Sequence, residues 1–93
     1  MTIRFSSRAL ADLEGIFEHV AGENRRAASA LVTRIELVIA MLAEHPKAGR
    51  PTHPAGRRVL TVPRLPYRVF YRIIGDDVFI LRIRHTSRRP IGS

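Results

Sequence analysis

The hydrophobic pattern of the chain begins with a short alternation and then changes to a helical period. Residues 2–5 alternate polar and apolar side chains, which predicts a first strand. Between residues 10 and 20 the apolar positions recur every three or four residues, as they do on one face of a helix. Ser6 and Ser7 precede this stretch, and a hydroxyl side chain at either position can cap the free N–H groups of a first helical turn. We therefore predict a helix that begins near these serines and ends at 21–24, where the pattern breaks.

A second and clearer helical stretch follows. Apolar residues recur at spacings of three and four from Ala28 to Leu42. His45-Pro46 is expected to end this helix, because the residue before a proline is forced out of the α region. Two helices joined by so short a break are expected to form an antiparallel hairpin whose apolar stripe faces a sheet.

The second half of the chain has strand-like sequence after an initial loop. Residues 47–56 contain two glycines and two prolines, which predicts a loop. Three strands are then expected at 57–62, 67–74 and 78–84, the last two joined by the short Gly75-Asp76-Asp77 turn. The predicted order is β-α-α-β-β-β. The fold class is α+β, with a helical hairpin packed on a small antiparallel sheet.

The charge pattern of the last two strands predicts how they pair. A three-residue loop would place Ile74 opposite Val78, whereas a two-residue loop would shift the pairing by one and mix arginines into both faces. We therefore predict the three-residue loop, which leaves one apolar face for the helices to cover. The opposite face is then predicted to carry Arg68, Phe70, Arg72, Ile74, Val78, Ile80, Arg82 and Arg84.

Length and composition fit one domain. At 93 residues the chain is long enough for one domain and too short for two, so we expect a single domain over 1–93 with a flexible tail at 90–93. Cysteine is absent, which excludes disulfides and thiolate metal sites. No secretory signal pattern opens the chain, and no apolar run reaches the roughly 20 residues that span a bilayer. A soluble, cytoplasmic protein with no membrane partner is therefore expected.

Positive charge is concentrated in the second half of the chain. The formal net charge is +8. From Lys47 onward there are eleven basic and two acidic residues, whereas residues 1–46 have a net charge of −1. All the basic residues but Lys47 are arginines, which bind carboxylate or phosphate groups in a bidentate way that lysine does not. This asymmetry predicts one face that meets something anionic.

A sheet face that mixes arginines with aliphatic side chains allows three interpretations. It could be a solvated face partly covered by the chain's own tail. It could be a groove for an acidic amphipathic segment of a protein. It could also be a face that binds or cleaves RNA, with arginines on the phosphates. Charge alone does not separate the second from the third.

Several short motifs, taken together, resemble a known family. The sequence is similar to the RelE/ParE toxin superfamily from about Phe5 to Pro90, and more similar to its ParE, plasmid-stabilisation branch. The order and spacing of the motifs carry the resemblance. They are Ala9, Asp12-Leu13 and Ile16 in the first helix, then Pro46, Gly49-Arg50-Pro51, Arg58, Tyr67-Arg68-Val69, Tyr71, Ile80-Leu81, and His85 with Arg88.

The resemblance implies a toxin with a cognate antitoxin, whose C-terminal segment wraps the toxin through apolar anchors and acidic residues. ParE-like members act on DNA gyrase, and RelE-like members cut mRNA on the ribosome. We predict a non-catalytic gyrase inhibitor that a ParD-like antitoxin neutralises. A ribosome-dependent mRNA endonuclease is the alternative, with RNA or the ribosome as its partner, and a degenerate non-toxic binding module is the third hypothesis.

Catalytic chemistry is the point on which these hypotheses differ. Cutting RNA through the 2′-hydroxyl requires a general base, a general acid and cations for the charged phosphate. The RelE-like pattern uses lysines on the sheet and a C-terminal tyrosine, whereas this chain has no lysine in its predicted strands and no tyrosine after Tyr71. If the protein is a nuclease, the catalytic candidates are Arg58, Arg68, Arg84 and His85. The other interpretation of His85 is a packed, hydrogen-bonded histidine at the end of the sheet.

The predicted sites therefore consist of binding residues. No metal-ligand spacing and no phosphate-loop pattern occurs, so neither a metal nor a cofactor is expected. The predicted antitoxin-binding residues are Arg68, Phe70, Arg72, Ile80 and Arg82. The predicted target-binding residues are Arg84, Arg88 and Arg89.

Overall fold

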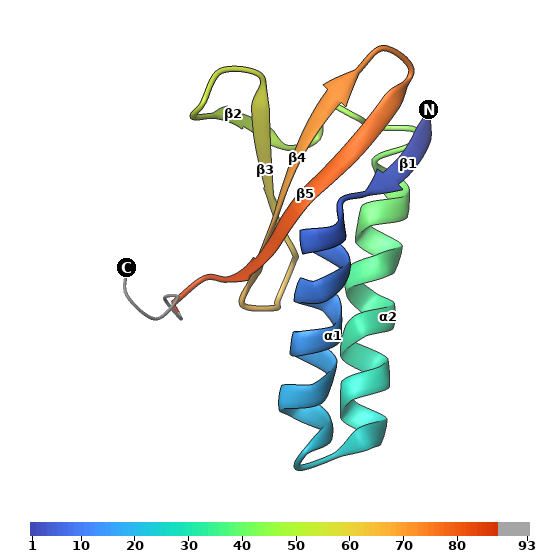
Figure 1. Cartoon of the computed structure of the whole chain (residues 1–93), viewed down its shortest axis with the longest axis vertical. Coiled ribbons are helices and arrows are strands. Elements are labelled where there is room, and N and C mark those ends of the chain that lie inside the picture. The colour runs from blue at the N-terminus through green and yellow to red at the C-terminus, as the bar shows by residue number, and fades with distance from the viewer. Residues whose placement is uncertain (88–93) are drawn as a thin grey trace.

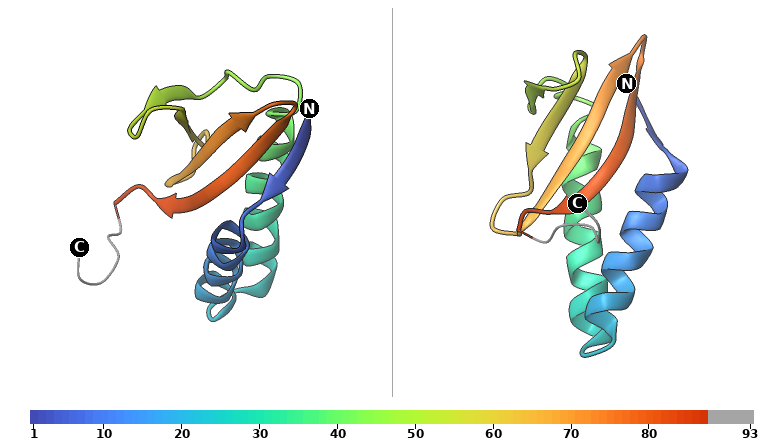
Figure 2. Two further views of the ribbon diagram at one scale, coloured as in Figure 1. Left: turned by 45° about the horizontal axis from the view of Figure 1, so that its top comes forward. Right: turned by 60° about the vertical axis from the view of Figure 1, so that its left-hand side comes forward.

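A computed structural model describes residues 1–87 and shows two helices against one face of a five-stranded sheet (Figure 1). The helices form an antiparallel hairpin, and the end that carries their connecting loop projects beyond the sheet (Figures 1 and 2). Neither helix in these 87 residues is long and apolar enough to cross a membrane. The elements are β1 (Thr2–Phe5), α1 (Ser7–Ala21), α2 (Arg25–Met41), β2 (Arg50–Thr52), β3 (Arg57–Thr61), β4 (Tyr67–Ile74) and β5 (Asp77–His85).

Side chains at the start of each helix explain where the helices begin. The Ser6 hydroxyl accepts a hydrogen bond from the Ala9 backbone N–H at 3.0 Å, so Ser6 is the N-cap of α1. Asn24 caps α2 in the same way, through the Ala27 N–H at 3.0 Å. Of the two predicted N-cap serines, the structure selects Ser6, and Ser7 is the first helical residue.

The predicted α+β class and the helical hairpin are confirmed, and the sheet has two features that the sequence did not predict. Its strand order is β1-β5-β4-β3-β2, and β1 runs parallel to β5, so the sheet is mixed rather than wholly antiparallel. The expectation that 47–56 is all loop is wrong, because β2 pairs there with β3. The second helix also ends at Met41, before the predicted stop at His45-Pro46.

The pairing of β4 with β5 differs from the prediction near the turn. Ile74 lies opposite Asp77 and Ile73 opposite Val78, so the predicted three-residue loop is wrong and the loop is Gly75-Asp76. The register then shifts between Phe70 and Tyr71, because Leu81 is an extra residue in β5. Beyond this bulge the pairs are Phe70 with Arg82, Arg68 with Arg84 and Tyr67 with His85, as predicted.

The two-residue turn changes the positions predicted for Val78 and Ile80, because the register is shifted by one residue between the turn and the bulge. Val78 and Ile80 are both fully buried, so they face the helices. The prediction that Val78 and Ile80 lie on the exposed arginine face is therefore wrong. The core between the sheet and the hairpin consists mainly of Ala9, Leu13, Ile35, Ile39, Leu42, Val62, Tyr67, Val69, Tyr71, Val78, Ile80 and Ile83.

A buried phenol fixes the connection from α2 to the sheet. The Tyr71 hydroxyl donates to the Pro46 carbonyl at 2.7 Å and accepts from the Gly49 N–H at 2.8 Å. Arg58 donates to the Gly49 carbonyl at 2.6 Å. Burial raises the pKa of Tyr71, which keeps the hydroxyl protonated and able to make both bonds. This arrangement brings β2 and β3 to one edge of the sheet.

Candidate functional site: an arginine-rich sheet face

One face of the sheet points away from the helices (Figure 2), and the strand register places most of the strand arginines on it. We call it the open face and define it by the cross-strand register. Phe70 lies opposite Arg82 and Val59, and successive residues of a strand point to opposite faces. The open face therefore includes Arg4, Arg57, Arg68, Phe70, Arg72, Phe79, Leu81, Arg82 and Arg84.

Like charges oppose one another directly on this face. Arg57 pairs with Arg72 across β3 and β4, and Arg68 pairs with Arg84 across β4 and β5. Directly opposed like charges destabilise a sheet. The Nε atoms of Arg57 and Arg72 are buried, and within residues 1–87 neither has a hydrogen-bond partner. Arg72 donates through a terminal nitrogen to the Ala55 carbonyl at 3.3 Å, but no carboxylate of residues 1–87 pairs with Arg57 or Arg72, so an external anion would relieve the repulsion.

The arginines surround apolar side chains in a shallow groove. Its volume is about 720 Å³, and the first residues of α1 form one wall. The Arg57 guanidinium lies 5.7 Å from the centre of the Phe70 ring, at cation–π distance. A ligand that fits this groove combines negative charge with apolar surface. The residues that line it include Arg8, Arg57, Phe70, Leu81, Arg82 and Arg84.

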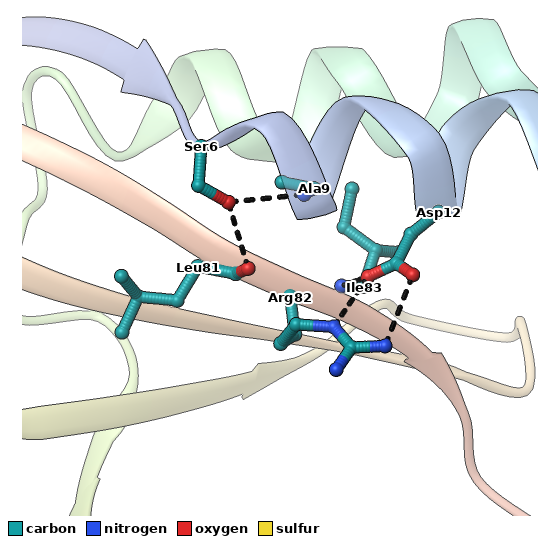
Figure 3. A network of polar contacts seen from close by, with 6 residues as sticks. All are labelled: Ser6, Ala9, Asp12, Leu81, Arg82 and Ile83. Carbon is teal, nitrogen blue, oxygen red and sulfur yellow. Dashed lines mark hydrogen bonds and ion pairs between the residues drawn. The ribbon is translucent and has the colours of Figure 1, made fainter. Parts of the chain in front are cut away.

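The helix α1 is joined to the edge of β5 by a network of polar contacts (Figure 3). β1 pairs with β5 only as far as Ile80, so the rest of β5 is an edge. The Ser6 hydroxyl donates to the Leu81 carbonyl at 2.9 Å, and the Asp12 carboxylate accepts from the Ile83 N–H at 2.8 Å. Side chains of α1 therefore satisfy edge groups that a neighbouring strand would otherwise bind.

The same carboxylate holds one arginine of the open face. Asp12 accepts from Arg82 Nε at 2.9 Å and from its terminal nitrogen at 3.2 Å (Figure 3). This hydrogen bond to Asp12 raises the pKa of Arg82, so the guanidinium stays charged. The Arg82 side chain is still 28% exposed and lines the groove. Arg82 is thus a fixed cation that is partly neutralised within the protein.

The nuclease candidates do not converge on one point. Arg68 and Arg84 lie together on the open face, whereas His85 is paired with Tyr67 on the covered face. The His85 and Tyr67 rings meet edge to face with centroids 5.3 Å apart, and His85 Nδ1 accepts from the Ser87 N–H at 3.1 Å. Arg58 lies opposite Tyr71, four residues along β4 from Tyr67, or roughly 13 Å at the rise of a strand.

The structure places the other predicted residues as follows. Arg68, Phe70, Arg72, Arg82 and Arg84 are on the open face, as the sequence predicted, and their roles remain predictions. Arg88, Arg89 and the tail at 90–93 lie outside the described residues. Sequence analysis missed two participants. Arg57 alternates with inward-facing residues of β3, so its face follows once the pairing of β3 with β4 is known. Asp12 is different, because nothing in the sequence linked it to Arg82, which is 70 residues away.

Comparison with known proteins gives a consistent family. A family model for the ParE toxin of the type II toxin–antitoxin system parDE matches residues 3–90. The chain is 36% identical to Toxin RelE2 of Caulobacter vibrioides, with 87% of this chain and 90% of that protein aligned. It is 38% identical to Toxin ParE3 of the same organism, with 77% and 73% aligned. A chain from the chromosomal ParDE toxin–antitoxin system of P. aeruginosa superposes with a TM-score of 0.84 at 31% identity, covering 94% of this chain and 97% of that one.

The shared fold and these likenesses define the class of protein. It is a toxin of a type II toxin–antitoxin system, from the superfamily that includes RelE and ParE. Within that superfamily, the chain belongs to the ParE toxin family.

Proposed function

We propose that this toxin inhibits DNA gyrase without cutting nucleic acid, and that a cognate ParD-like antitoxin neutralises it. Membership of the ParE family and the close superposition on a chain of a ParDE system support this proposal. The structural observation that carries it is that, within residues 1–87, the carboxylates on the open face are held in ion pairs with arginines and His85 lies on the other face of the sheet.

The antitoxin is proposed to bind the open face. Opposed arginine pairs favour a ligand with several carboxylates, because each carboxylate would separate two like charges. Phe70 and Leu81 provide apolar contacts between the cations. The proposed antitoxin-binding residues are Arg68, Phe70, Arg72 and Arg82. Ile80 is withdrawn from this set because it is fully buried in the core.

Acid–base chemistry on this face has little support among residues 1–87. None of the five strands contains a glutamate or a lysine. The aspartates that reach the open face from α1 and β5 are both in ion pairs, Asp12 with Arg82 and Asp77 with Arg4. His85 faces the other side of the sheet from Arg68 and Arg84. The arginines therefore suit binding better than proton transfer.

The target is proposed to contact the end of the β4–β5 strand pair that lies away from the Gly75-Asp76 turn. Arg84 lies there on the open face, and Arg88 and Arg89 follow in the sequence.

A second candidate function, cleavage of mRNA, is favoured by the likeness to Toxin RelE2 and by the Arg68–Arg84 pair, which could bind a phosphate.

The two functions differ in what changes inside cells. The toxin would be induced with and without its operon neighbour, and plasmid topology and transcript ends would be followed in the same cultures. We expect relaxed plasmid DNA, unchanged transcript ends, and protection by the neighbour. New transcript ends with normal supercoiling would replace the proposal with mRNA cleavage. Normal growth without the neighbour would indicate a non-toxic binding module.

A further inference from the structure

The surface of α2 that faces away from the core carries two exposed apolar side chains. Leu37 is 64% exposed and Met41 is 41% exposed, and they lie one turn apart on the same face of the helix. The buried residues Ile35 and Ile39 occupy the opposite face. Leu37 has the highest exposed fraction among the large apolar side chains of residues 1–87, which makes this face a candidate contact surface.

A mostly apolar hollow adjoins this face. It has a volume of about 490 Å³ and forms where α2 ends and the chain turns toward β2. Because Met41 lines the hollow and lies one turn from Leu37, a protruding apolar side chain and an apolar hollow are neighbours on one surface. The other lining residues are His45, Pro46, Lys47 and Ala48.

Two charged side chains flank the apolar pair. Arg34 lies three residues before Leu37, and Glu44 lies three residues after Met41. The helical path continues to Glu44, since its N–H donates to the Met41 carbonyl at 3.1 Å. Both charged side chains are exposed, and neither forms an ion pair within residues 1–87. We call this surface the α2 outer face and define it by Arg34, Leu37, Met41 and Glu44.

These four positions are symmetric about position 39. In a contact between two identical copies related by a twofold axis, residue i meets residue j and j meets i. Antiparallel packing of two α2 helices about position 39 brings Leu37 opposite Met41 of the second copy, where the hollow can receive it. The same packing brings Arg34 opposite Glu44 of the second copy. One axis therefore satisfies both the apolar and the charged pair.

The charges of the face favour a second copy over the other partners. An acidic antitoxin segment would meet Glu44, and a basic partner would meet Arg34, whereas a second copy presents the opposite charge at both positions. The formal net charge of +8 does not prevent this contact. The open-face arginines lie on the far side of the sheet from α2 (Figure 2), and charges separated by more than about 8 Å are largely screened at physiological salt.

We infer that the α2 outer face is a self-association surface, through which two copies of the free toxin pack as an antiparallel, twofold-symmetric pair. A contact between one helix of each copy belongs to the smallest class of interfaces, those under about 1,200 Å², whose complexes are weak and transient. We expect a dissociation constant on the order of 10 μM. The open face stays free in this pair, so the inference does not depend on the proposed function.

Sedimentation equilibrium of the purified toxin over a range of concentrations tests the inference. Arg34→Glu and Glu44→Arg each place like charges opposite one another, whereas the double variant restores opposite charges and the wild-type net charge. Leu37→Asp removes the apolar contact. Leu10→Asp is the matched control, at a leucine of α1 that is 51% exposed and lies outside the face. Thermal unfolding would establish that every variant is folded.

We expect Leu37→Asp and each single charge variant to raise the dissociation constant about tenfold, with the double variant close to wild type and Leu10→Asp unchanged. A wild-type toxin that stays monomeric at about 1 mM would overturn the inference, as would a dimer that the α2 variants do not weaken. If the toxin is monomeric and Leu37→Asp instead lowers antitoxin affinity or gyrase inhibition, the face belongs to that partner and the inference fails.

Disulfide cross-linking tests the antiparallel arrangement separately, because the chain has no cysteine of its own. Leu37→Cys mixed with Met41→Cys should form a covalent dimer faster than either variant alone, since a disulfide requires Cα atoms within about 7 Å. Cross-linking of Leu37→Cys to itself as fast as in the mixture would indicate a parallel pair and would overturn the inference.

Discussion

Asp12 offers the sharpest test of how the arginine face is built. Its carboxylate accepts three hydrogen bonds, two from Arg82 and one from the Ile83 N–H, and so joins α1 to the edge of β5. We predict that Asp12→Ala destabilises the protein by about 2.5–4 kcal/mol. A charged hydrogen bond contributes about 1.5–3 kcal/mol, which suits the bond to Ile83. The Arg82 pair adds only about 1 kcal/mol, because the Arg82 side chain is 28% exposed and water replaces part of the lost interaction.

Two further variants separate the contributions. Asp12→Asn keeps an oxygen for the Ile83 N–H but loses the charge, so we expect a loss of about 1 kcal/mol. In a double-mutant cycle with Arg82→Met, the coupling energy should also be about 1 kcal/mol, because each single variant already loses the Asp12–Arg82 interaction and the double variant loses it only once. Urea unfolding would measure each value, with the shift in midpoint converted through the common slope. A loss below about 0.5 kcal/mol for Asp12→Ala, or no coupling, would refute the reasoning that this pair fixes Arg82.

Three other predictions concern the buried Tyr71 hydroxyl and the arginines of the open face. Gly49→Ala should destabilise the protein by about 2 kcal/mol or more in urea unfolding, because a Cβ there would lie 2.7 Å from the Tyr71 hydroxyl and ring and 2.8 Å from the Val59 carbonyl. The free energy of unfolding should fall as pH rises above about 10, because burial raises the pKa of Tyr71 and the unfolded phenol ionises first. Replacing Arg68, Arg72 and Arg82 together by glutamate should weaken antitoxin binding by several kcal/mol, measured by calorimetry.

Each of these predictions has its own control. Gly22→Ala should be mild, since the nearest atoms to its added Cβ are 3.7 Å away, and equal losses at both glycines would contradict the packing argument. Tyr71→Phe should lack the alkaline loss that the wild type shows, because it has no phenol at that buried position. A loss of the same size in Tyr71→Phe would assign it to another group. Unchanged antitoxin affinity in the arginine variant would place the antitoxin on another surface.

The helices and the long strands could be predicted from the sequence, but the details of the sheet could not. The period of apolar residues in α1 and α2 is unambiguous, and the alternation in β4 fixed its ends. β2 was missed because Pro51 and the surrounding glycines favour a loop, and only an edge strand tolerates such a proline. The bulge at Leu81 was missed because residues 78–81 are all apolar. Either alternate set of these residues could face the core, so the sequence does not show which set is buried.

The candidate site could be predicted in part, because the register of β4 with β5 was predicted correctly only beyond the bulge. Arg68, Arg72, Arg82 and Arg84 follow the bulge-free pattern of β4 or lie beyond the bulge in β5, and their shared face was predicted correctly. Ile80 lies between the turn and the bulge, where the predicted register was shifted by one residue, and was therefore placed on the wrong face. The link from Asp12 to Arg82 depends on how α1 packs along β5, which no local pattern encodes.

The central claim is that this toxin acts on gyrase by binding. Its most direct test is a supercoiling assay with purified gyrase, relaxed plasmid and increasing toxin, with and without an equimolar amount of the antitoxin. The account predicts that toxin alone blocks supercoiling and stabilises the cleaved gyrase–DNA complex, and that the antitoxin restores activity. Full supercoiling at saturating toxin, with no cleaved DNA retained, would contradict it.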